Sequence, residues 1–459
     1  MKMYNLVNKI KYSWHKIYNS YTYNLLRSYL GLQIISQVNS LVSLFFVAKY
    51  LGPANLGLIS YAQYLAMMTV FTGSGIDTYT TYKLLRHPEE RETSQIFARS
   101  YRAKILLSII GVLIVLPIVI WKSDNSYELT MYITSITLAT FSCSFLSLFA
   151  SYSISHRLVP SFNRSAMVAS ISILISRIAF VYYHLPAIYF LIILLCDTII
   201  TLSIFIIFNF KLMKSRNLFF DLNIYKKHFK EAIYLKSFLT FIKNEIVNAM
   251  HVIYEAKYYL GIYVFSLLAS RADLYMLKFY VSNHDLGIYS AALRLAEYPG
   301  VASGIIGNVL IISLALSVRS KIRYGAIAIG YTSNIILALS FIVLFAVFGS
   351  HITRFIYGEA YTGVDKVLFV YSIGIVGIFV NNFSSLIFMI HKKEKYLLYS
   401  SIVGSIMLAS LCWLWIPVYG LYGAAIASSI TYISVSILSL AAAYRIEVKH
   451  KRNNDITLL

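Results

Sequence analysis

Eight charged residues lie within long apolar stretches of this 459-residue chain: Asp77, Arg177, Asp197, Arg271, Asp273, Lys278, Arg294 and Glu297. Each would cost roughly 2.5–3.5 kcal/mol at the centre of a bilayer, so we expect these side chains to face one another or an aqueous cavity. The arginines offer a planar fork of donors that suits phosphate oxygens. The carboxylates are candidates for binding a proton or a sodium ion, and so for coupling transport to an ion gradient.

Depth along the expected helices suggests which of these charges form pairs. Counted at 1.5 Å per residue from a turn near 281–285, Asp273 and Arg294 lie at similar depth. Arg271 and Glu297 match one another slightly deeper. Such pairs either hold helices together or form the wall of a polar, partly cationic cavity, and the sequence leaves both interpretations open.

The other four charges are Arg177, Asp197, Lys278 and Asp77. Arg177 and Asp197 occupy similar depths in a second expected hairpin. Lys278 is close to the expected outer interface, and we interpret it as extending toward that interface. Asp77 lies near the inner end of its apolar run and is either a gating residue or an interfacial charge.

Uncharged polar residues and missing motifs narrow the chemistry further. Asn381 and Asn382 are candidates for hydrogen bonds to sugar hydroxyls, or for hydrogen bonds between helices. The sequence contains no G-x-x-x-x-G-K-[ST], no H-E-x-x-H and no paired C-x-x-C, so ATP hydrolysis and metal catalysis are not expected. We therefore predict no catalytic residue, no metal site and no cofactor, with coupling to H⁺ or Na⁺ left open.

The elements that position these residues are membrane-spanning helices. The chain is 58% hydrophobic and 13% charged, whereas a soluble domain carries about 25% charged residues. Runs of roughly 20 apolar residues predict an all-α polytopic membrane protein with twelve spans: 28–48, 56–82, 105–121, 129–152, 166–183, 188–208, 258–280, 286–312, 325–348, 367–390, 397–416 and 420–443.

The positive charges predict the orientation of these spans. Most of the 40 Lys and Arg residues fall in the two termini and in the loops that follow the even-numbered spans. The opposite loops hold only Lys49, Lys122, Arg354 and Lys366. By the positive-inside rule, both termini are expected in the cytoplasm. This bias accounts for the net charge of +21, so we expect no nucleic-acid partner.

The sequence repeats itself about half a chain apart. The stretch "YLGPANLGLISYA" at 50–62 corresponds to "YVSNHDLGIYSAA" at 280–292, which aligns Gly57 with Gly287. Six spans in each half give both halves the same orientation, as in transporters that hold substrate between two parallel lobes. We interpret the two glycines as positions of tight turns or close helix contact.

The repeat divides the chain into five expected regions. They are a cytoplasmic amphipathic segment, an N-terminal six-helix lobe, a basic cytoplasmic loop, a C-terminal six-helix lobe and a cytoplasmic tail, at 1–27, 28–208, 209–257, 258–443 and 444–459. The amphipathic pattern itself covers residues 3–25, where apolar residues recur at helical spacing with lysines between them.

Four stretches together resemble the Wzx-type polysaccharide repeat-unit flippases of the multidrug/oligosaccharidyl-lipid/polysaccharide exporter superfamily. These stretches are "SRADLYMLKFYVSNHDLGIYSAALRLAEYP", "YLGPANLGLISYAQ", "FIYGEAYTGVDKVLFVYSIGIVGIFVNN" and "IPVYGLYGAAIASSITYI". The resemblance implies a MATE-like bundle of two six-helix lobes around a central cavity. It also implies translocation of an undecaprenyl-pyrophosphate-linked oligosaccharide across the bacterial cytoplasmic membrane, for O-antigen, capsule or exopolysaccharide.

Partners and alternatives follow from the same resemblance. The expected partners are the lipid-linked oligosaccharide and membrane lipids, with a polysaccharide polymerase and a chain-length regulator as further candidates. A multidrug or cation antiporter of the same superfamily is the nearest alternative, although such a protein favours an acidic cavity over one with three arginines. A membrane-embedded glycan polymerase or transferase is a second alternative, but the outer loops here are short. Lipid II flippases usually have fourteen spans, which argues against that assignment.

Overall fold

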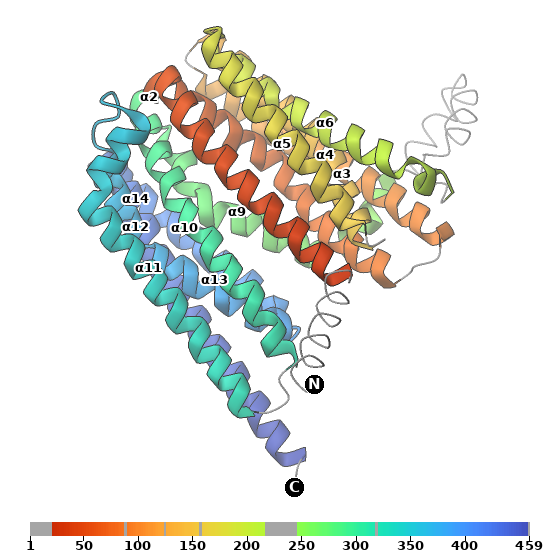
Figure 1. Ribbon diagram of the computed structural model, residues 1–459. Helices are drawn as coiled ribbons and strands as arrows, with labels where there is room; N and C mark the ends of the chain where they lie inside the picture. Colours follow the sequence, from red (N-terminus) through yellow and green to blue (C-terminus); the bar gives the residue numbers. More distant parts are fainter. Residues whose placement is uncertain are drawn as a thin grey trace, which may run out of the picture. The chain divides into compact units, whose positions relative to one another are not determined.

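The computed structural model describes residues 21–86, 90–123, 125–155, 158–215, 246–316 and 320–457 (Figure 1). Within these ranges the chain is helical, with no β-strand, which confirms the expected all-α class. Most of the amphipathic segment expected at 3–25 and most of the basic loop expected at 209–257 lie outside the described residues.

The helices follow the predicted apolar runs closely. Their bounds are α2 Tyr21–Arg86, α3 Glu90–Lys122, α4 Ser126–Ser155, α5 Val159–Tyr182, α6 Ala187–Ser215, α9 Lys257–Leu277, α10 Asn283–Leu316, α11 Ser320–Tyr357, α12 Val364–Ile373, α13 Ile375–Ile390 and α14 Glu394–Thr457.

All twelve predicted spans fall on these helices. Helices α2 and α14 each contain two spans, separated by a kink at Gly52 and at Gly420. The span expected at 367–390 is divided into α12 and α13, which meet at a 41° bend. Among the described residues, seven helices are long and apolar enough to cross a membrane, or eight if α12 and α13 form one bent span.

The two kinks occur where the sequence predicts turns between spans. Gly52 has φ 70° and ψ 170°, and Gly420 has φ 53° and ψ −125°. A side chain strongly disfavours both conformations, because only glycine enters these regions without a steric penalty. Pro53 follows the first kink and Pro417 precedes the second, which adds to the interruption of the helix.

Gly420→Ala is therefore expected to destabilise the protein by about 1–3 kcal/mol, the typical cost of a strained backbone conformation. Thermal unfolding of the purified protein checks this. Gly349→Ala in α11 is the matched control, because a Cβ there would meet nothing within 4 Å and the backbone shows no positive φ. Equal stability of the two variants would contradict the prediction.

The chain forms two compact units. The first unit contains 1–47, 72–114 and 134–256, and the second contains 48–71, 115–133 and 257–459. The second unit thus combines the C-terminal half with two segments of the N-terminal half. The lobe boundaries expected from the sequence, 28–208 and 258–443, stay a prediction.

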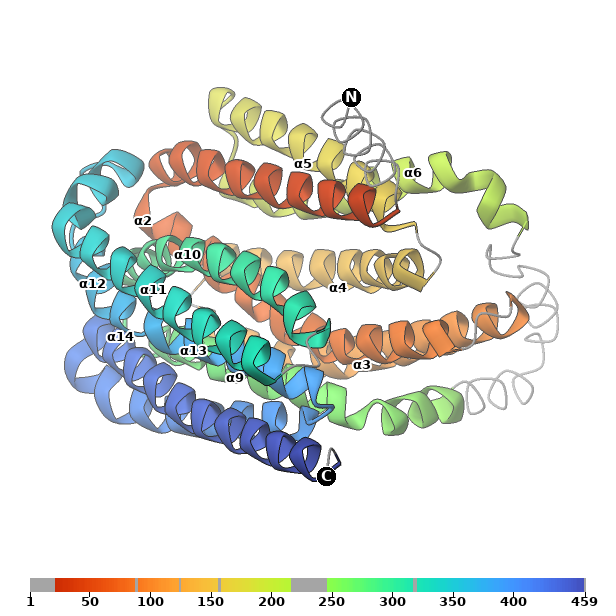
Figure 2. The same cartoon turned by 60° about the horizontal axis from the view of Figure 1, so that its bottom comes forward.

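Within each unit, some helices that pack together are neighbours in the sequence and others are far apart in it. In the first unit α5 packs along α6 (Figure 1). In the second unit α9 packs mainly against α14, and α13 packs against α14 as well (Figure 2). Helices α10, α11 and α12 contact one another.

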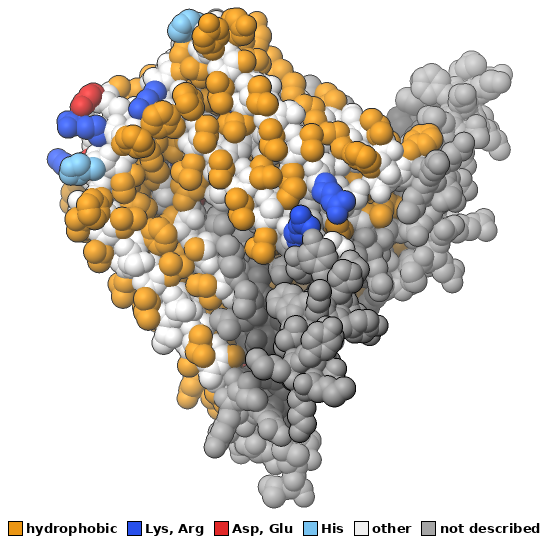
Figure 3. Space-filling model, in the orientation of Figure 1, with side chains coloured by type: hydrophobic (Ala, Val, Ile, Leu, Met, Phe, Trp, Pro, Cys, Tyr) orange, Lys and Arg blue, Asp and Glu red, His pale blue; other side chains and the backbone are white. Residues whose placement is uncertain are grey.

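Hydrophobic side chains cover most of the described part of the face shown in Figure 3. Large apolar residues with about two-thirds of their surface exposed occur on several helices, among them Ile34, Leu113, Ile175 and Val343. Exposed apolar area of this extent is unusual for a soluble protein and is suited to contact with lipid.

The repeated stretches contact each other within the second unit. A Cβ atom added at Gly57 would lie 2.6 Å from the backbone nitrogen of Gly287, and one added at Gly287 would lie 2.6 Å from the carbonyl carbon of Pro53. The backbones therefore touch where only a hydrogen atom fits. This confirms the expectation that both glycines mark a close helix contact.

Candidate functional site

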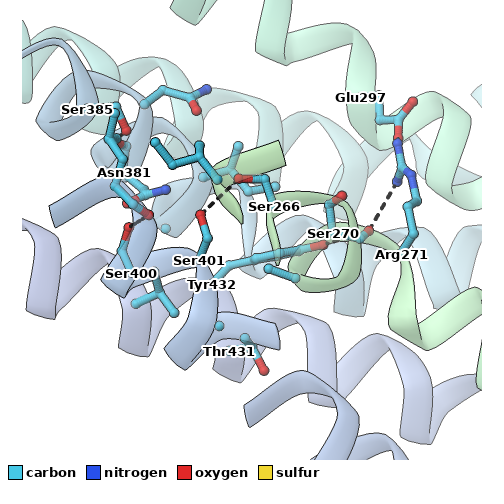
Figure 4. Close-up of a pocket in the computed structure, with 18 of the residues that line it drawn as sticks. Ser266, Ser270, Arg271, Glu297, Asn381, Ser385, Ser400, Ser401, Thr431 and Tyr432 are labelled. Atoms are coloured by element: carbon cyan, nitrogen blue, oxygen red, sulfur yellow. Dashed lines mark hydrogen bonds and ion pairs between the residues drawn. The ribbon is translucent and has the colours of Figure 1, made fainter. Parts of the chain in front are cut away.

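A pocket of about 510 Å³ lies within the second unit (Figure 4). Helices α9, α13 and α14 supply most of its wall, while α10 contributes Glu297 and α12 contributes Tyr371. The volume lies in the range of ligand-binding pockets, about 300–1,000 Å³. Four sequence-predicted site residues line it: Arg271, Glu297, Asn381 and Asn382.

Small residues allow the wall of the pocket to close tightly. A Cβ at Gly377 of α13 would lie 2.6 Å from the backbone nitrogen of Ile433 in α14. At Gly404 of α14, a Cβ would lie 3.2 Å from Ala269 Cβ on α9. Glycines at these crossings bring the backbones of neighbouring helices together, so polar side chains of three helices reach one cavity.

The charged end of the pocket is the ion pair between Arg271 and Glu297, as the sequence predicted (Figure 4). The Arg271 side chain is 18% exposed and that of Glu297 is 42% exposed. The guanidinium also lies over the ring of Tyr64, with 5.0 Å between Cζ and the ring centroid. Glu297 accepts from Nη2 of the guanidinium, and the backbone carbonyl oxygen of Ser270 accepts from Nη1 at 3.4 Å. Arg271 lines the pocket, and a guanidinium has further donors for oxygen acceptors.

The other end of the pocket is lined by amide and hydroxyl groups. Ser266 and Ser401 share a hydrogen bond of 2.8 Å, and the Ser385 hydroxyl donates to the carbonyl oxygen of Asn381 at 2.8 Å. Two buried atoms of the lining, Asn381 Oδ1 and Thr431 Oγ1, have no hydrogen-bond partner among the described residues. Buried polar atoms are nearly always bonded in folded proteins, so this wall is suited to a ligand rich in hydroxyl groups.

The predicted pairing of Asp273 with Arg294 is wrong. Asp273 is fully buried and accepts hydrogen bonds from the Tyr289 hydroxyl, from Ser428 Oγ at 2.8 Å and from its neighbour's backbone N–H. Arg294 Nη2 instead donates to Ser60 Oγ and Gln63 Oε1, each at 3.1 Å. The two side chains bond to different neighbouring helices: Asp273 to α10 and α14, and Arg294 to α2.

Lys278 also departs from its expected position. It does not extend to an interface, because its side chain is only 2% exposed and forms an ion pair with Glu128, with 3.5 Å between Nζ and Oε2. Lys278 Nζ donates to Asn283 Oδ1 at 2.5 Å, and the Asn283 amide donates to Glu128. Lys278 does not line the pocket; burial with a carboxylate partner satisfies its charge.

The predicted site residues of the first unit form separate groups. Asp77 accepts two hydrogen bonds from Lys104 Nζ, at 2.7 and 2.9 Å, so it is a paired charge within the helix bundle. Arg177 Nη1 donates to Ser43 Oγ at 2.9 Å. Its predicted pairing with Asp197 stays a prediction.

Sequence reasoning missed two of the charged partners. Lys104 and Glu128 each lie one residue outside a predicted span, at 105–121 and 129–152, so neither is among the eight charges predicted within spans. A charge at the edge of an apolar run, with an opposite intramembrane charge at similar depth, is the signal that would have identified them. Ser428 and Thr431 carry no such signal, since serine and threonine are common in membrane helices.

Comparison with protein-family models shows the family of the chain. The model of the polysaccharide biosynthesis protein family matches residues 27–312, which is more than half of the chain. The chain belongs to this family. No curated protein gave a significant match.

Solved structures establish the fold of this polysaccharide biosynthesis protein. It is similar to an inward-facing multidrug resistance MATE family transporter of the MOP superfamily, with TM-score 0.69, 12% identity, and 93% of this chain and 99% of that chain covered. It is also similar to the lipid II flippase MurJ in an inward closed conformation, with TM-score 0.65, 16% identity and coverage of 93% and 90%.

A third solved structure has the same fold. A MOP superfamily transporter from Pyrococcus furiosus Vc1 matches with TM-score 0.51, 13% identity and coverage of 95% and 98%. The chain thus has the MATE-like fold predicted from its sequence and is a multi-pass membrane protein. The matched proteins are transporters and a flippase, in agreement with the prediction of a transporter and not an enzyme.

Proposed function

We propose that the protein flips an undecaprenyl-pyrophosphate-linked oligosaccharide repeat unit from the cytoplasmic to the outer leaflet of the bacterial cytoplasmic membrane, for O-antigen, capsule or exopolysaccharide. The observation that carries the proposal is the composition of the pocket in the second unit. It places the Arg271–Glu297 ion pair at one end and a wall of amide and hydroxyl side chains at the other.

Each end of the pocket matches one part of such a substrate. The Arg271 guanidinium would donate to pyrophosphate oxygens, and the amide and hydroxyl wall would offer donors and acceptors to sugar hydroxyls. Membership of the polysaccharide biosynthesis family supports a glycan substrate. The fold shared with a lipid II flippase supports a lipid-linked one.

Ion coupling and partner proteins belong to the same proposal. Asp273 is the candidate coupling carboxylate for H⁺ or Na⁺, since it is fully buried and held by hydroxyl donors on α10 and α14. A polysaccharide polymerase and a chain-length regulator would receive the flipped unit. In this arrangement both termini of the chain lie in the cytoplasm.

Deleting the gene in its host tests the proposal. Single repeat units on undecaprenyl pyrophosphate should accumulate while the surface polymer disappears. Both quantities can be measured in lipid extracts and on whole cells. Normal surface glycan together with greater sensitivity to cationic drugs would contradict the proposal and favour the multidrug antiporter, whose fold this chain shares.

Arg271→Gln is expected to reduce restoration of surface glycan by about 10-fold or more, because a hydrogen bond to a charged group contributes roughly 1.5–3 kcal/mol. Arg271→Lys should restore only part of the activity, since an ammonium group lacks the planar fork. Surface glycan is quantified in the deletion strain, with protein abundance measured by immunoblot.

Arg354→Gln is the control for charge removal. Its ion pair with Glu359 has side chains 73% and 76% exposed, and such pairs contribute little. Full restoration by Arg271→Gln at normal abundance would show that the guanidinium does not bind substrate.

A further inference from the structure

A second pocket, of about 230 Å³, lies in the first unit and shares no lining residue with the pocket described above. It is formed by the end of α2, the early turns of α3 and the helical residues 246–255. Basic side chains come from each of these elements: Lys83, Arg99 and His251. The proposed transport function assigns no role to this pocket.

The single acidic residue of the lining is already bonded within the protein. Glu255 accepts a hydrogen bond from the Tyr79 hydroxyl, and its Oε2 lies 3.3 Å from Lys83 Nζ. The bond from Tyr79 lowers the pKa of the Glu255 carboxyl, so it remains ionised as the partner of Lys83. The lining thus contains two cationic side chains, Lys83 and Arg99, and one carboxylate, so the pocket has a net positive charge before His251 is counted.

A buried hydroxyl group adds an independent indication of a ligand. Ser100 is 0% exposed and lines the pocket, and its Oγ has no hydrogen-bond partner among the residues that the structure describes. A serine in a helix commonly bonds a carbonyl of the preceding turn. Here the hydroxyl of a pocket-lining residue forms no such bond, which leaves it available to a ligand oxygen.

The exposed face of the helical residues 246–255 indicates that the anion belongs to a membrane lipid. At 100° per residue this helix has three adjoining faces. Ala249 and Val252 are buried, and His251 and Glu255 face the pocket. The third face, beside the polar one, is apolar yet about half exposed or more, and consists of Ile246, Val247, Met250 and Tyr254. An exposed apolar face next to a basic cavity is the pattern of a helix lying at a membrane surface.

We propose that this pocket binds the phosphate group of an anionic phospholipid. Arg99, His251 and the Ser100 hydroxyl would donate to the phosphate oxygens, while the acyl chains would lie along the apolar face of residues 246–255. The bound lipid would thereby anchor the chain just before Lys257, where the first unit ends and the second begins.

Native mass spectrometry of the full-length protein in detergent tests this, with phosphatidylglycerol and phosphatidylcholine as the probes. Phosphatidylglycerol should be retained preferentially. Arg99→Gln should lower its apparent affinity about three- to tenfold, as expected for one charge-assisted contact at a partly exposed site. Ser100→Ala should also lower the apparent affinity for phosphatidylglycerol. Lipid binding elsewhere on the protein should keep its preference.

Arg445→Gln is the matched control, because Arg445 is an exposed arginine on α14, outside the pocket. It should leave lipid retention unchanged. Equal retention by Arg99→Gln and wild type would overturn the proposal. Displacement of phosphatidylglycerol by millimolar inorganic phosphate would also overturn it, since the pocket would then be a site for free phosphate and not for a lipid.

Discussion

Gly287→Ala is expected to destabilise the protein by about 1–3 kcal/mol or more, the typical cost of overpacking a close contact. The added Cβ would lie 2.6 Å from the carbonyl carbon of Pro53 and closer still to its oxygen. Both neighbours are backbone atoms, so no side-chain rotation can relieve the overlap. Thermal unfolding of the purified protein and its abundance in membranes would both report the loss.

Gly304→Ala is the matched control on the same helix, because a Cβ there would meet nothing within 4 Å. Gly57→Ala should resemble Gly287→Ala, since its Cβ would lie 2.6 Å from Gly287 N. The double variant should cost less than the sum of the two single variants, because both changes disrupt one contact. Wild-type stability of Gly287→Ala would mean that the two segments do not touch.

This contact explains why the sequence repeats itself. Gly57 and Gly287 are equivalent positions of two related hairpins, and each lies against the backbone of the other hairpin. A contact between equivalent surfaces requires a small residue on both sides, as in a symmetric dimer where the same patch meets itself. Both halves therefore kept Leu-Gly at the same place.

Lys278→Met is expected to destabilise the protein by about 3–5 kcal/mol, the cost of breaking a buried ion pair by removing one partner. The Glu128 carboxylate, whose side chain is 4% exposed, would lose the cation 3.5 Å away and retain the hydrogen bond from the Asn283 amide. A shift in the thermal unfolding of the detergent-solubilised protein measures this effect.

Combining Lys278→Met with Glu128→Gln should recover most of the lost stability. Glutamine still offers an oxygen to the Asn283 amide but carries no charge, so no ion remains buried without a counterion. Removing Arg354 from its exposed pair with Glu359 should shift unfolding little. A double variant as unstable as Lys278→Met alone would show that the charge of Glu128 is not the source of the cost.

The residues of the pocket show how far helix depth can predict a site. Arg271 and Glu297 were paired correctly, and Asn381 lines the same cavity. Asp273 and Arg294 were matched by the same counting, yet Asp273 bonds to Ser428 while Arg294 bonds to Ser60. Counting residues gives the height of a side chain along its helix, but not the direction in which it points.

The sequence by itself determined the helical elements and which charges they carry. Each membrane helix satisfies its own backbone hydrogen bonds, so the length of an apolar run is a local property that can be counted. Only the tertiary structure decided which helices meet. It placed Glu128 beside Lys278, Lys104 beside Asp77, and residues 48–71 with the C-terminal half. Which helices contact each other depends on the rotation and close packing of all neighbouring helices together. No single stretch of sequence contains that information.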